Sequence, residues 1–352
     1  MRILQINTER GWRGGERQTL LTALGLRAAG DTVELLARAG GALAREARAQ
    51  GLTVHATGSG FSMAVWLARH GGDYDIVHPQ TAKGMTWAAL TKVLHRARLV
   101  FTRRTSFPVG RGHWLTRLKW LQADRLVAIS DASAKAPLAM GLHPVVIRSA
   151  VPPVEPDPAR VQGFVERFQL QGKRLIGTAA ALTREKDPVT LIRAAQRVCE
   201  HHDDVVFVHW GADGDVSDEA RKAIEVTGLT DRYLLAGFES RVEQLFGALS
   251  VFVMASRHEA LGSSVLDAML LHVPVVSTDA GGLRETLALG RGLTGPVGDP
   301  QVMADNIITF LDDPVVAAQM ADRAYAYMAS EHDVGHMVRR YRDVYQEVLE
   351  GH

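Results

Sequence analysis

The sequence predicts an α/β protein with two doubly wound domains that face each other across a cleft. Short apolar runs alternate with amphipathic helical stretches along the chain, and this alternation is typical of parallel sheets. The 352 residues are also too many for one ordinary hydrophobic core. Four prolines between Pro152 and Pro158 can continue neither a helix nor a central strand, so we expect the domain boundary there.

The strand–helix alternation occurs on both sides of this proline-rich segment. In the first half we expect strands at residues 2–7, 32–37, 52–55, 76–78, 99–102 and 125–129, and helices at 16–29, 43–50 and from Ser130 onward. In the second half we expect strands at 175–181, 205–210, 233–235, 251–254 and 273–277, and helices at 188–201, 218–226 and 336–349.

These elements divide the chain into three parts. We expect an N-terminal domain over residues 1–152, a C-terminal domain over residues 159–330, and a terminal helix within residues 331–352 that packs back toward the N-terminal domain. The composition, 46% hydrophobic and 22% charged, is that of an ordinary globular protein. The single cysteine, Cys199, excludes an internal disulfide and a cysteine-based metal cluster. No apolar run approaches the roughly 18 residues that span a bilayer. The start of the chain reads as a strand and not as a signal peptide, so we expect a cytoplasmic protein.

The charge is distributed unevenly, although the net charge is only +1. Residues 1–150 contain 21 Lys and Arg against 9 Asp and Glu, whereas residues 151–352 contain 19 against 30. A basic half attracts an anionic partner such as nucleic acid, lipid headgroups or a phosphorylated substrate. The alternative is that the two halves of the chain attract each other.

The segment after the expected strand 251–254 contains the groups most suited to chemistry. Gly262 frees the backbone to turn, and Ser263 or Ser264 is a natural N-cap for the helix that follows. Such a helix start is an anion site because its first amides are unpaired. Glu259 lies in the loop and Asp267 about one turn inside the helix, and carboxylates are good acceptors for paired sugar hydroxyls. This combination suits a nucleoside diphosphate sugar.

Residues 256–285 resemble the signature of the retaining family 4 glycosyltransferases, which have the GT-B fold of two Rossmann-like domains. The resemblance consists of Glu259, Asp267, Ala268-Met269, Pro274-Val275-Val276, Gly281-Gly282 and Glu285, in the family's order and spacing. It implies that Glu259 contacts the donor sugar, that Asp267 binds the ribose, and that Ser263 and Ser264 hold the diphosphate. The family more often has Glu at the position of Asp267.

Two further segments match the family. Lys186 follows the first strand of the second domain, where similar enzymes place a lysine that stabilises the departing diphosphate. Their upstream arginine is replaced by Ala181, and Arg184 is a candidate substitute. Gly14 and Gly15 join the first strand to the first helix, where similar enzymes carry a glycine pair that lets the backbone approach the donor.

The first domain departs from the family. Arg104 stands after Arg103 where related enzymes often have a histidine, and an arginine can hold a phosphate or an acidic sugar but cannot act as a base. His78 ends the strand 76–78 and is a second candidate on the cleft side, with packing in the interior as the alternative. We take His78, Arg103 and Arg104 as candidates for contacts with the acceptor.

The resemblance implies transfer with retention of anomeric configuration and without a metal or other cofactor. Asp213 and Asp215 have the spacing of a metal-binding pair, but a glycine loop is expected at that position anyway. The donor is a UDP-, GDP- or ADP-linked sugar. No triad of nucleophile and base is visible, which disfavours Ser, Thr and Cys nucleophiles.

The acceptor is predicted from the basic first domain. Residues 112–121 place two tryptophans and three leucines beside cations that include Arg103, Arg104, Arg111, Arg117 and Lys119, as in a helix lying in a membrane interface. The alternative is a core-packed amphipathic helix. Family members of this kind often build lipopolysaccharide or other envelope glycans on lipid-linked anionic acceptors. We therefore expect a peripheral enzyme at the inner face of the cytoplasmic membrane.

Two other functions remain open. A nucleotide-sugar epimerase shares the architecture, although the spacing of Glu259 and Asp267 disfavours it. A catalytically silent nucleotide-binding scaffold is the other alternative, because the upstream arginine and the histidine are missing. We expect no binding of nucleic acid, since the sequence has a basic half but no recognisable motif.

Overall fold

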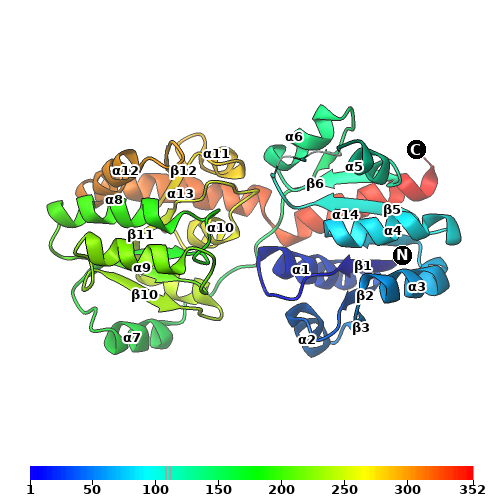
Figure 1. Ribbon diagram of the computed structural model, residues 1–352, viewed down its shortest axis with the longest axis horizontal. Helices are drawn as coiled ribbons and strands as arrows, with labels where there is room; N and C mark the ends of the chain where they lie inside the picture. Colours follow the sequence, from blue (N-terminus) through cyan, green and yellow to red (C-terminus); the bar gives the residue numbers. More distant parts are fainter. Residues whose placement is uncertain (108, 111–112, 352) are drawn as a thin grey trace. The chain divides into compact units, whose positions relative to one another are not determined.

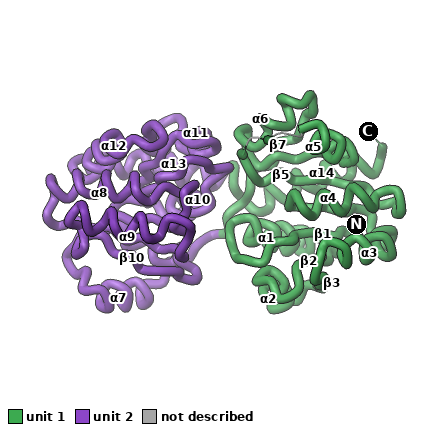
Figure 2. The backbone as a smooth tube through the Cα atoms, in the orientation of Figure 1, with its two compact units in different colours: residues 1–152, 331–352 green, residues 153–330 purple. Residues whose placement is uncertain are grey.

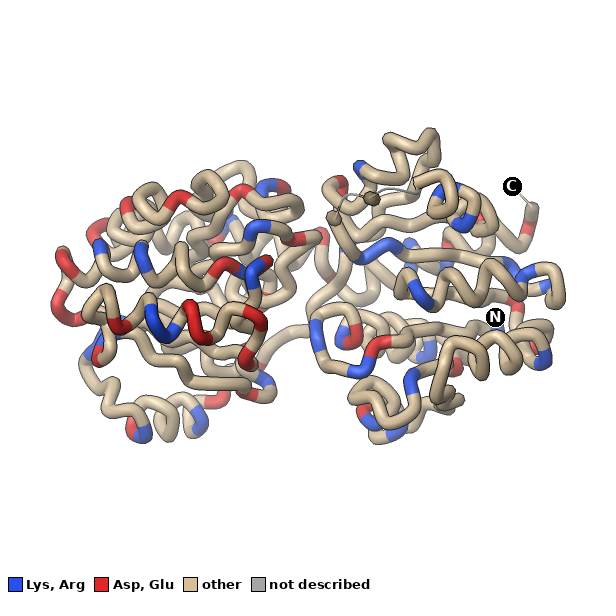
Figure 3. Tube along the Cα trace, viewed as in Figure 1, with Lys and Arg blue, Asp and Glu red and all other residues tan. Residues whose placement is uncertain are grey.

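The computed structural model describes residues 1–107, 109–110 and 113–351, and it consists of two compact units (Figures 1 and 2). Unit 1 contains residues 1–152 and 331–352, and unit 2 contains residues 153–330. Unit 1 has 24 Lys and Arg against 14 Asp and Glu, and unit 2 has 16 against 25. Figure 3 shows these basic and acidic residues along the chain.

Unit 1 is built on a seven-stranded parallel sheet in the order β3-β2-β1-β4-β5-β6-β7. Its strands are β1 (Arg2–Asn7), β2 (Thr32–Arg38), β3 (Thr53–Thr57), β4 (Ile76–Pro79), β5 (Arg98–Arg103), β6 (Arg125–Ala128) and β7 (Val145–Val146). Its helices are α1 (Gly14–Ala28), α2 (Ala42–Ala49), α3 (Gly60–His70), α4 (Ala82–Thr91), α5 (His113–Trp120), α6 (Asp131–Ala139) and α14 (Val334–Glu350), with short turns η1 (Gly71–Asp73) and η2 (Lys92–Leu94). The strand order reverses direction at β1, and ligands of open α/β sheets bind beside such switch points.

The last helix, α14, completes the core of unit 1. Its buried face contributes six side chains, Met337, Val338, Tyr341, Val344, Tyr345 and Val348, to the cluster that surrounds β1 and α1. Gly25 permits the close approach of α1, because a Cβ at Gly25 would lie 2.5 Å from Cγ2 of Val338. A helix that is distant in sequence is thus held by apolar burial on one face.

Unit 2 is built on a six-stranded parallel sheet in the order β10-β9-β8-β11-β12-β13. Its strands are β8 (Arg174–Ala179), β9 (Val205–Trp210), β10 (Tyr233–Gly237), β11 (Leu249–Met254), β12 (Val275–Thr278) and β13 (Leu293–Gly295). Its helices are α7 (Pro158–Arg167), α8 (Pro188–His201), α9 (Ser217–Val226), α10 (Ser263–Leu270), α11 (Gly282–Leu287), α12 (Pro300–Asp312) and α13 (Pro314–Glu331), with the turn η3 (Val242–Ala248). As in unit 1, the reversal of strand order occurs at the first strand, here β8, beside β11.

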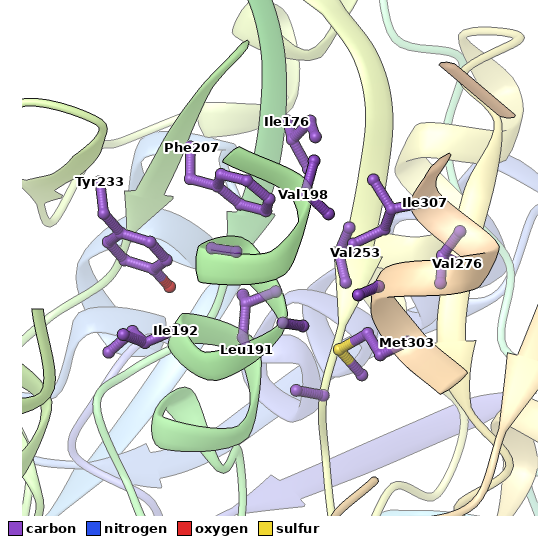
Figure 4. Close-up of a cluster of buried hydrophobic side chains, with 14 of the residues drawn as sticks. Ile176, Leu191, Ile192, Val198, Phe207, Tyr233, Val253, Val276, Met303 and Ile307 are labelled. Atoms are coloured by element: carbon purple, nitrogen blue, oxygen red, sulfur yellow. The ribbon is translucent and has the colours of Figure 1, made fainter. Parts of the chain in front are cut away.

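The core of unit 2 lies between this sheet and the helices α8 and α12 (Figure 4). Phe207 on β9 and Tyr233 on β10 stack with their planes 6° apart. Met303 and Ile307 of α12 and Ile192 of α8 are almost entirely buried in the same cluster. Helices normally cover both faces of a parallel sheet. This packing holds the strands in place, and the loops of the site follow the ends of these strands. Among the described residues, no helix is long and apolar enough to cross a membrane.

Candidate functional site

Two loops of unit 2 meet where the neighbouring strands β8 and β11 end. The amide of Arg257 donates to the carbonyl oxygen of Glu185 at 2.7 Å, which ties the loop after β11 to the loop after β8. The guanidinium of Arg257 also pairs with Oδ2 of Asp187 at 2.8 Å. Asp187 is buried and caps α8, since its carboxylate accepts from the amide of Thr190 at 3.4 Å and also from the Thr190 hydroxyl at 2.8 Å. Its left-handed backbone, with φ of 47°, turns the chain into the helix directly after Lys186.

These contacts bring Lys186 and Glu259 together. The ammonium group Nζ of Lys186 forms an ion pair with Oε2 of Glu259, and the Ser256 hydroxyl lies 3.5 Å from the same oxygen. The side chains of Lys186 and Glu259 keep 21% and 15% of their surface exposed. A ligand can therefore reach both groups, while the surrounding protein strengthens their electrostatic effect.

Gly262 begins the helix α10 beside this pair. The expectation that Ser263 or Ser264 caps the helix is wrong, because both serines lie inside α10 and Gly262 is the N-cap residue. Its φ of 81° is in the left-handed region, and a Cβ there would lie 2.6 Å from Cδ2 of Leu283. Glycine thus places the first amides of α10, and with them the positive end of the helix dipole, next to Glu259. The hydroxyl of Ser264 donates to the carbonyl oxygen of Ala179 at the end of β8, at 3.2 Å.

Gly281 and Gly282, which follow β12, pack against the loop that contains Glu259. The amide of Gly282 donates to the carbonyl oxygen of Glu259 at 2.9 Å. A Cβ at Gly282 would lie 2.1 Å from the carbonyl oxygen of Ala260, so no other residue fits this contact without displacing the backbone. Asp267 lies within α10 and is 3% exposed. The segment 256–285 is therefore one packed unit around the Glu259 loop.

Gly14 and Gly15 stand at the start of α1 in unit 1. The helix start is capped by Glu16, whose carboxylate accepts from the amide of Arg13 at 2.9 Å. Burial raises the pKa of Glu16, and the hydrogen bonds from Arg13 and Asn7 oppose that rise. A Cβ at Gly15 would meet no atom within 4 Å, so the space above this helix start is open.

The three acceptor candidates of unit 1 have different surroundings. His78 is wholly buried, with Nε2 2.7 Å from the hydroxyl of Thr102 and Nδ1 2.7 Å from that of Tyr345. Burial, together with the nearby charge of Arg104, lowers the pKa of His78 to about 3. The expectation that His78 faces a cleft is therefore wrong, because α14 covers the end of β4.

Arg103 is also an interior residue, and the expectation of an acceptor contact is corrected for it too. Its guanidinium donates to the carbonyl oxygens of Ser133 and Phe107 and lies 5.6 Å from the ring centre of Trp120. These contacts leave Arg103 holding the loop after β5 in place.

Arg104 is half-buried and points into a polar network. Its guanidinium donates to Oε1 of Gln80 and, at 3.1 Å, to the hydroxyl of Ser149. Gln80 in turn donates to Oε1 of Gln5 at 2.6 Å. Of the three acceptor candidates, Arg104 is the one that keeps a part of its surface exposed. Arg111 and Gly112 lie outside the described residues.

The remaining charged candidates of unit 2 are engaged with their neighbours. The amide of Arg184 donates to Oδ1 of Asp215 at 3.0 Å, and its guanidinium pairs with Glu219 on α9 at 3.5 Å. Asp213 pairs with Arg221 at 2.6 Å. Within the described part of the chain, no group of His, Cys, Asp and Glu has the arrangement of a metal site.

Ser256 and Arg257 also hold the central pair in place, and neither residue has a local signature in the sequence. The signal for Asp187 was available, because Asp187-Pro188-Val189-Thr190 combines an N-cap residue with proline at the first helical position. The ion pair of Asp187 with Arg257 joins residues from different loops and has no local signature.

Comparisons with known proteins identify this arrangement. A family model described as Glycosyl transferases group 1 matches residues 164–327, and another described as Glycosyltransferase Family 4 matches residues 12–156. The chain is 30% identical over 211 residues to 2-deoxystreptamine glucosyltransferase of Streptomyces kanamyceticus, a match covering 58% of this chain and 54% of that protein. It is 24% identical over 220 residues to the lipopolysaccharide core biosynthesis mannosyltransferase LpcC of Rhizobium leguminosarum bv. viciae, covering 60% and 61%. The matches thus span less than two thirds of these relatives.

Solved structures share the architecture over the full length. Anabaena HepE in complex with UDP-glucose has a TM-score of 0.88 at 21% identity, over 99% of this chain and 100% of that one. Sucrose-phosphate synthase from Thermosynechococcus elongatus has a TM-score of 0.81 at 15% identity, over 100% of both chains. The two parallel sheets and the site at the strand ends define a protein of the GT-B glycosyltransferase fold. The two family matches cover adjoining stretches, and the chain belongs to glycosyltransferase family 4.

Proposed function

We propose that this protein transfers a sugar from a nucleotide-sugar donor to a glycan or lipid-linked acceptor, with retention of anomeric configuration. The observation that carries the proposal is the pairing of Lys186 with Glu259 beside the start of α10. A cation, a carboxylate and a helix N-terminus together match a diphosphate bonded to a sugar. Membership of glycosyltransferase family 4 supports the same activity.

The donor is held by residues of unit 2 in this proposal. Lys186 leaves its ion pair with Glu259 and binds the diphosphate, together with the first amides of α10 at Ser263 and Ser264. Glu259 then accepts hydrogen bonds from the sugar hydroxyls. Asp267 binds the ribose. HepE, which binds UDP and UDP-glucose, supports a nucleotide-sugar donor of this kind.

The reaction needs no protein nucleophile. The acceptor oxygen forms a bond to the anomeric carbon on the face from which the diphosphate departs, and the bond between that carbon and the phosphate oxygen breaks. The acceptor proton passes to a diphosphate oxygen. Lys186 and the α10 amides stabilise the negative charge that grows on the leaving group, and Glu259 fixes the sugar ring.

A panel of nucleotides tests donor binding. UDP, GDP and ADP, each with and without a sugar, should include one that raises the apparent melting temperature of the protein, because a ligand of the folded state stabilises it by mass action. Asp267→Asn should weaken binding of the free nucleoside diphosphate. Glu259→Gln should impair sugar transfer more than nucleotide binding. A chain that binds none of these nucleotides would exclude the proposal.

The two alternatives are separated by turnover. An epimerase would convert the sugar nucleotide without an acceptor, and a silent scaffold would bind the nucleotide without turnover. Release of nucleoside diphosphate that depends on an acceptor and is abolished by Glu259→Ala excludes both.

The pathway we propose is lipopolysaccharide or other envelope-glycan synthesis at the inner face of the cytoplasmic membrane. LpcC, named for lipopolysaccharide core biosynthesis, supports this assignment. No Asp or Glu occurs between Asp75 and Asp124, a stretch with nine Lys and Arg. Such a stretch suits anionic lipids and anionic acceptors.

A patch of exposed apolar side chains accompanies these cations. It consists of Leu90, Val93 and Leu94 on α4 and η2 and of Trp114, Leu115, Leu118 and Leu121 on and after α5, each 46% to 86% exposed. The two groups lie side by side, since Nζ of Lys92 donates to the carbonyl oxygen of Gln122 at 2.5 Å. Apolar side chains rimmed by cations suit an anionic bilayer surface.

Sedimentation with vesicles tests this contact. The protein should bind vesicles that contain phosphatidylglycerol and not those of phosphatidylcholine alone. Leu118→Glu should weaken that binding, whereas Val226→Glu, an equally apolar exposed site in unit 2, should not. Equal and negligible binding to both vesicles would exclude the membrane contact.

A further inference from the structure

A cavity of about 390 Å³ opens in unit 1 at the carboxyl ends of β1, β2 and β3. Its lining includes Glu9, Arg10, Arg38, Lys83 and Trp87. All of these residues belong to unit 1, and none of them has a role in the proposed donor site. Residues of α3 and α4, two helices that pack against each other, also line it.

Three cations line this cavity against one carboxylate. Arg10 follows β1, Arg38 ends β2, and Lys83 lies in the first turn of α4. Within the described ranges, the side chains of these three residues form no hydrogen bond or ion pair. Cations that converge on a cavity while unpaired attract an anion, since the cavity walls exclude part of the screening water.

A helix start also borders this cavity. Thr57 ends β3, is 5% exposed and lines the cavity. Two residues later Ser59 caps α3, accepting from the amide of Ser62 at 3.1 Å. The first amides of this 11-residue helix face the same end of the sheet and favour negative charge.

The remaining wall is apolar. Gly60 allows the indole of Trp87 to lie against the start of α3, because a Cβ at Gly60 would be 2.2 Å from Nε1 of Trp87. Met63 is buried beneath it. A bare inorganic anion gains nothing from this surface, whereas a sugar ring places its apolar face on an aromatic side chain. The cavity is large enough for one such ring, and ligand sites typically combine an apolar wall with a few placed polar groups.

We propose that this cavity is a subsite for an acidic sugar, whose phosphate or carboxylate lies between Arg10, Arg38 and Lys83. The sugar ring lies on Trp87, and Glu9 accepts from a sugar hydroxyl. The assignment of this sugar to the acceptor rests on the proposed function, but its binding does not. The subsite selects acceptors by charge, independently of the donor.

Direct binding to the whole chain tests the subsite. Glucose 6-phosphate and glucuronate are the probes, glucose is the uncharged control, and calorimetry or saturation-transfer NMR is the readout. At least one acidic sugar should bind ten-fold or more tightly than glucose, and which one binds distinguishes phosphate from carboxylate. Arg38→Gln and Lys83→Gln should each weaken that binding about ten-fold, and Arg69→Gln, an exposed cation of α3 outside the cavity, should not. Equal affinity for glucose, or equal effects of the three substitutions, would overturn the proposal.

Two further measurements test whether the acidic sugar binds at the subsite or at the proposed donor site. Glu259→Gln should leave that binding unchanged, and Arg38→Gln should leave nucleotide binding unchanged. Failure of nucleotide binding alone would count against the proposed function and not against the subsite. Loss of sugar binding through Glu259→Gln would overturn the subsite.

Discussion

The pairing of Lys186 with Glu259 makes a prediction for catalysis and for stability together. Lys186→Met keeps the length of the side chain and removes its charge, so the departing diphosphate loses one preorganised cation. Loss of a single group of this kind typically costs about 10²–10³ in turnover, or about 3–4 kcal/mol in the transition state. We expect a loss of that size in kcat, measured as release of nucleoside diphosphate in the presence of donor and acceptor.

The same substitution should lower the stability of the unliganded protein. The two side chains are 21% and 15% exposed, so the pair lies between an exposed ion pair and a fully buried one. Exposed pairs contribute up to about 1 kcal/mol and breaking buried pairs costs about 3–5 kcal/mol, so we expect about 1–2 kcal/mol for either single substitution. The double variant of Lys186→Met with Glu259→Gln should recover part of this loss, because it leaves no unpaired buried charge.

The two effects separate a structural role from a catalytic one. If the pair only holds the loops together, the double variant regains activity along with stability. In our interpretation it regains stability and remains inactive. Lys222→Met, which removes an exposed cation of α9, is the control for both assays. Turnover close to wild type in folded Lys186→Met would refute the reasoning.

Three further predictions follow from the packing. Gly282→Ala should destabilise unit 2 by at least about 2 kcal/mol, measured by chemical denaturation, because its Cβ would lie 2.1 Å from the carbonyl oxygen of Ala260. Tyr345→Phe should cost about 0.5–1.5 kcal/mol in thermal unfolding, since it removes the hydroxyl 2.7 Å from Nδ1 of buried His78, which keeps the amide nitrogen of Gln5 at 3.2 Å. Burial lowers the pKa of His78 to about 3 and that of His209 to about 4, so both stay neutral in the folded protein while the unfolded chain takes up protons below pH 6.5. The free energy of unfolding should therefore be highest above pH 6.5. It should fall as the pH is lowered toward 4, by about 1.4 kcal/mol per pH unit for each histidine.

Each of these three predictions has a control substitution or a result that would contradict it. Gly247→Ala should be tolerated, because its Cβ would find nothing closer than 3.9 Å. Tyr325→Phe, at a site 41% exposed, should change stability by less than about 0.5 kcal/mol. A free energy of unfolding that does not change between pH 7 and pH 4 would contradict the assignment of neutral buried histidines.

Local sequence determined the elements with strong periodicity. The helix 188–201 and the strand 205–210 occur with the bounds that the pattern predicts, because Asp187-Pro188 marks the helix start and both segments have one clear apolar pattern. The edge strands β7 and β13 have two and three residues, which are too few to show the alternation of apolar and polar side chains that predicts a strand. The pattern also does not predict α3, α4, α7, α12 or α13. In α4, alanine, glycine and threonine weaken the contrast between a buried and an exposed face.

The donor segment could be predicted because its residues are close together in the sequence. Glu259, Gly262, Asp267 and the Gly281-Gly282 pair lie within one strand–loop–helix stretch, so their order in the sequence is close to their order in space. The N-cap residue of α10 could not be predicted in the same way. Serine is a good N-cap in an extended conformation, whereas the N-cap here has a left-handed backbone, and a Cβ at this position would lie 2.6 Å from Leu283.

Only the tertiary structure decided what lies between distant segments. Lys186 and Glu259 are 73 residues apart, and their contact depends on β8 and β11 being neighbours in the sheet. His78 ends a strand just as a ligand-binding residue would, but a helix 267 residues away covers it. The unit 1 cavity likewise joins the ends of three strands with two helices. Sequence periodicity records which face of an element is apolar, whereas the partner of that face is set by the packing of the whole sheet.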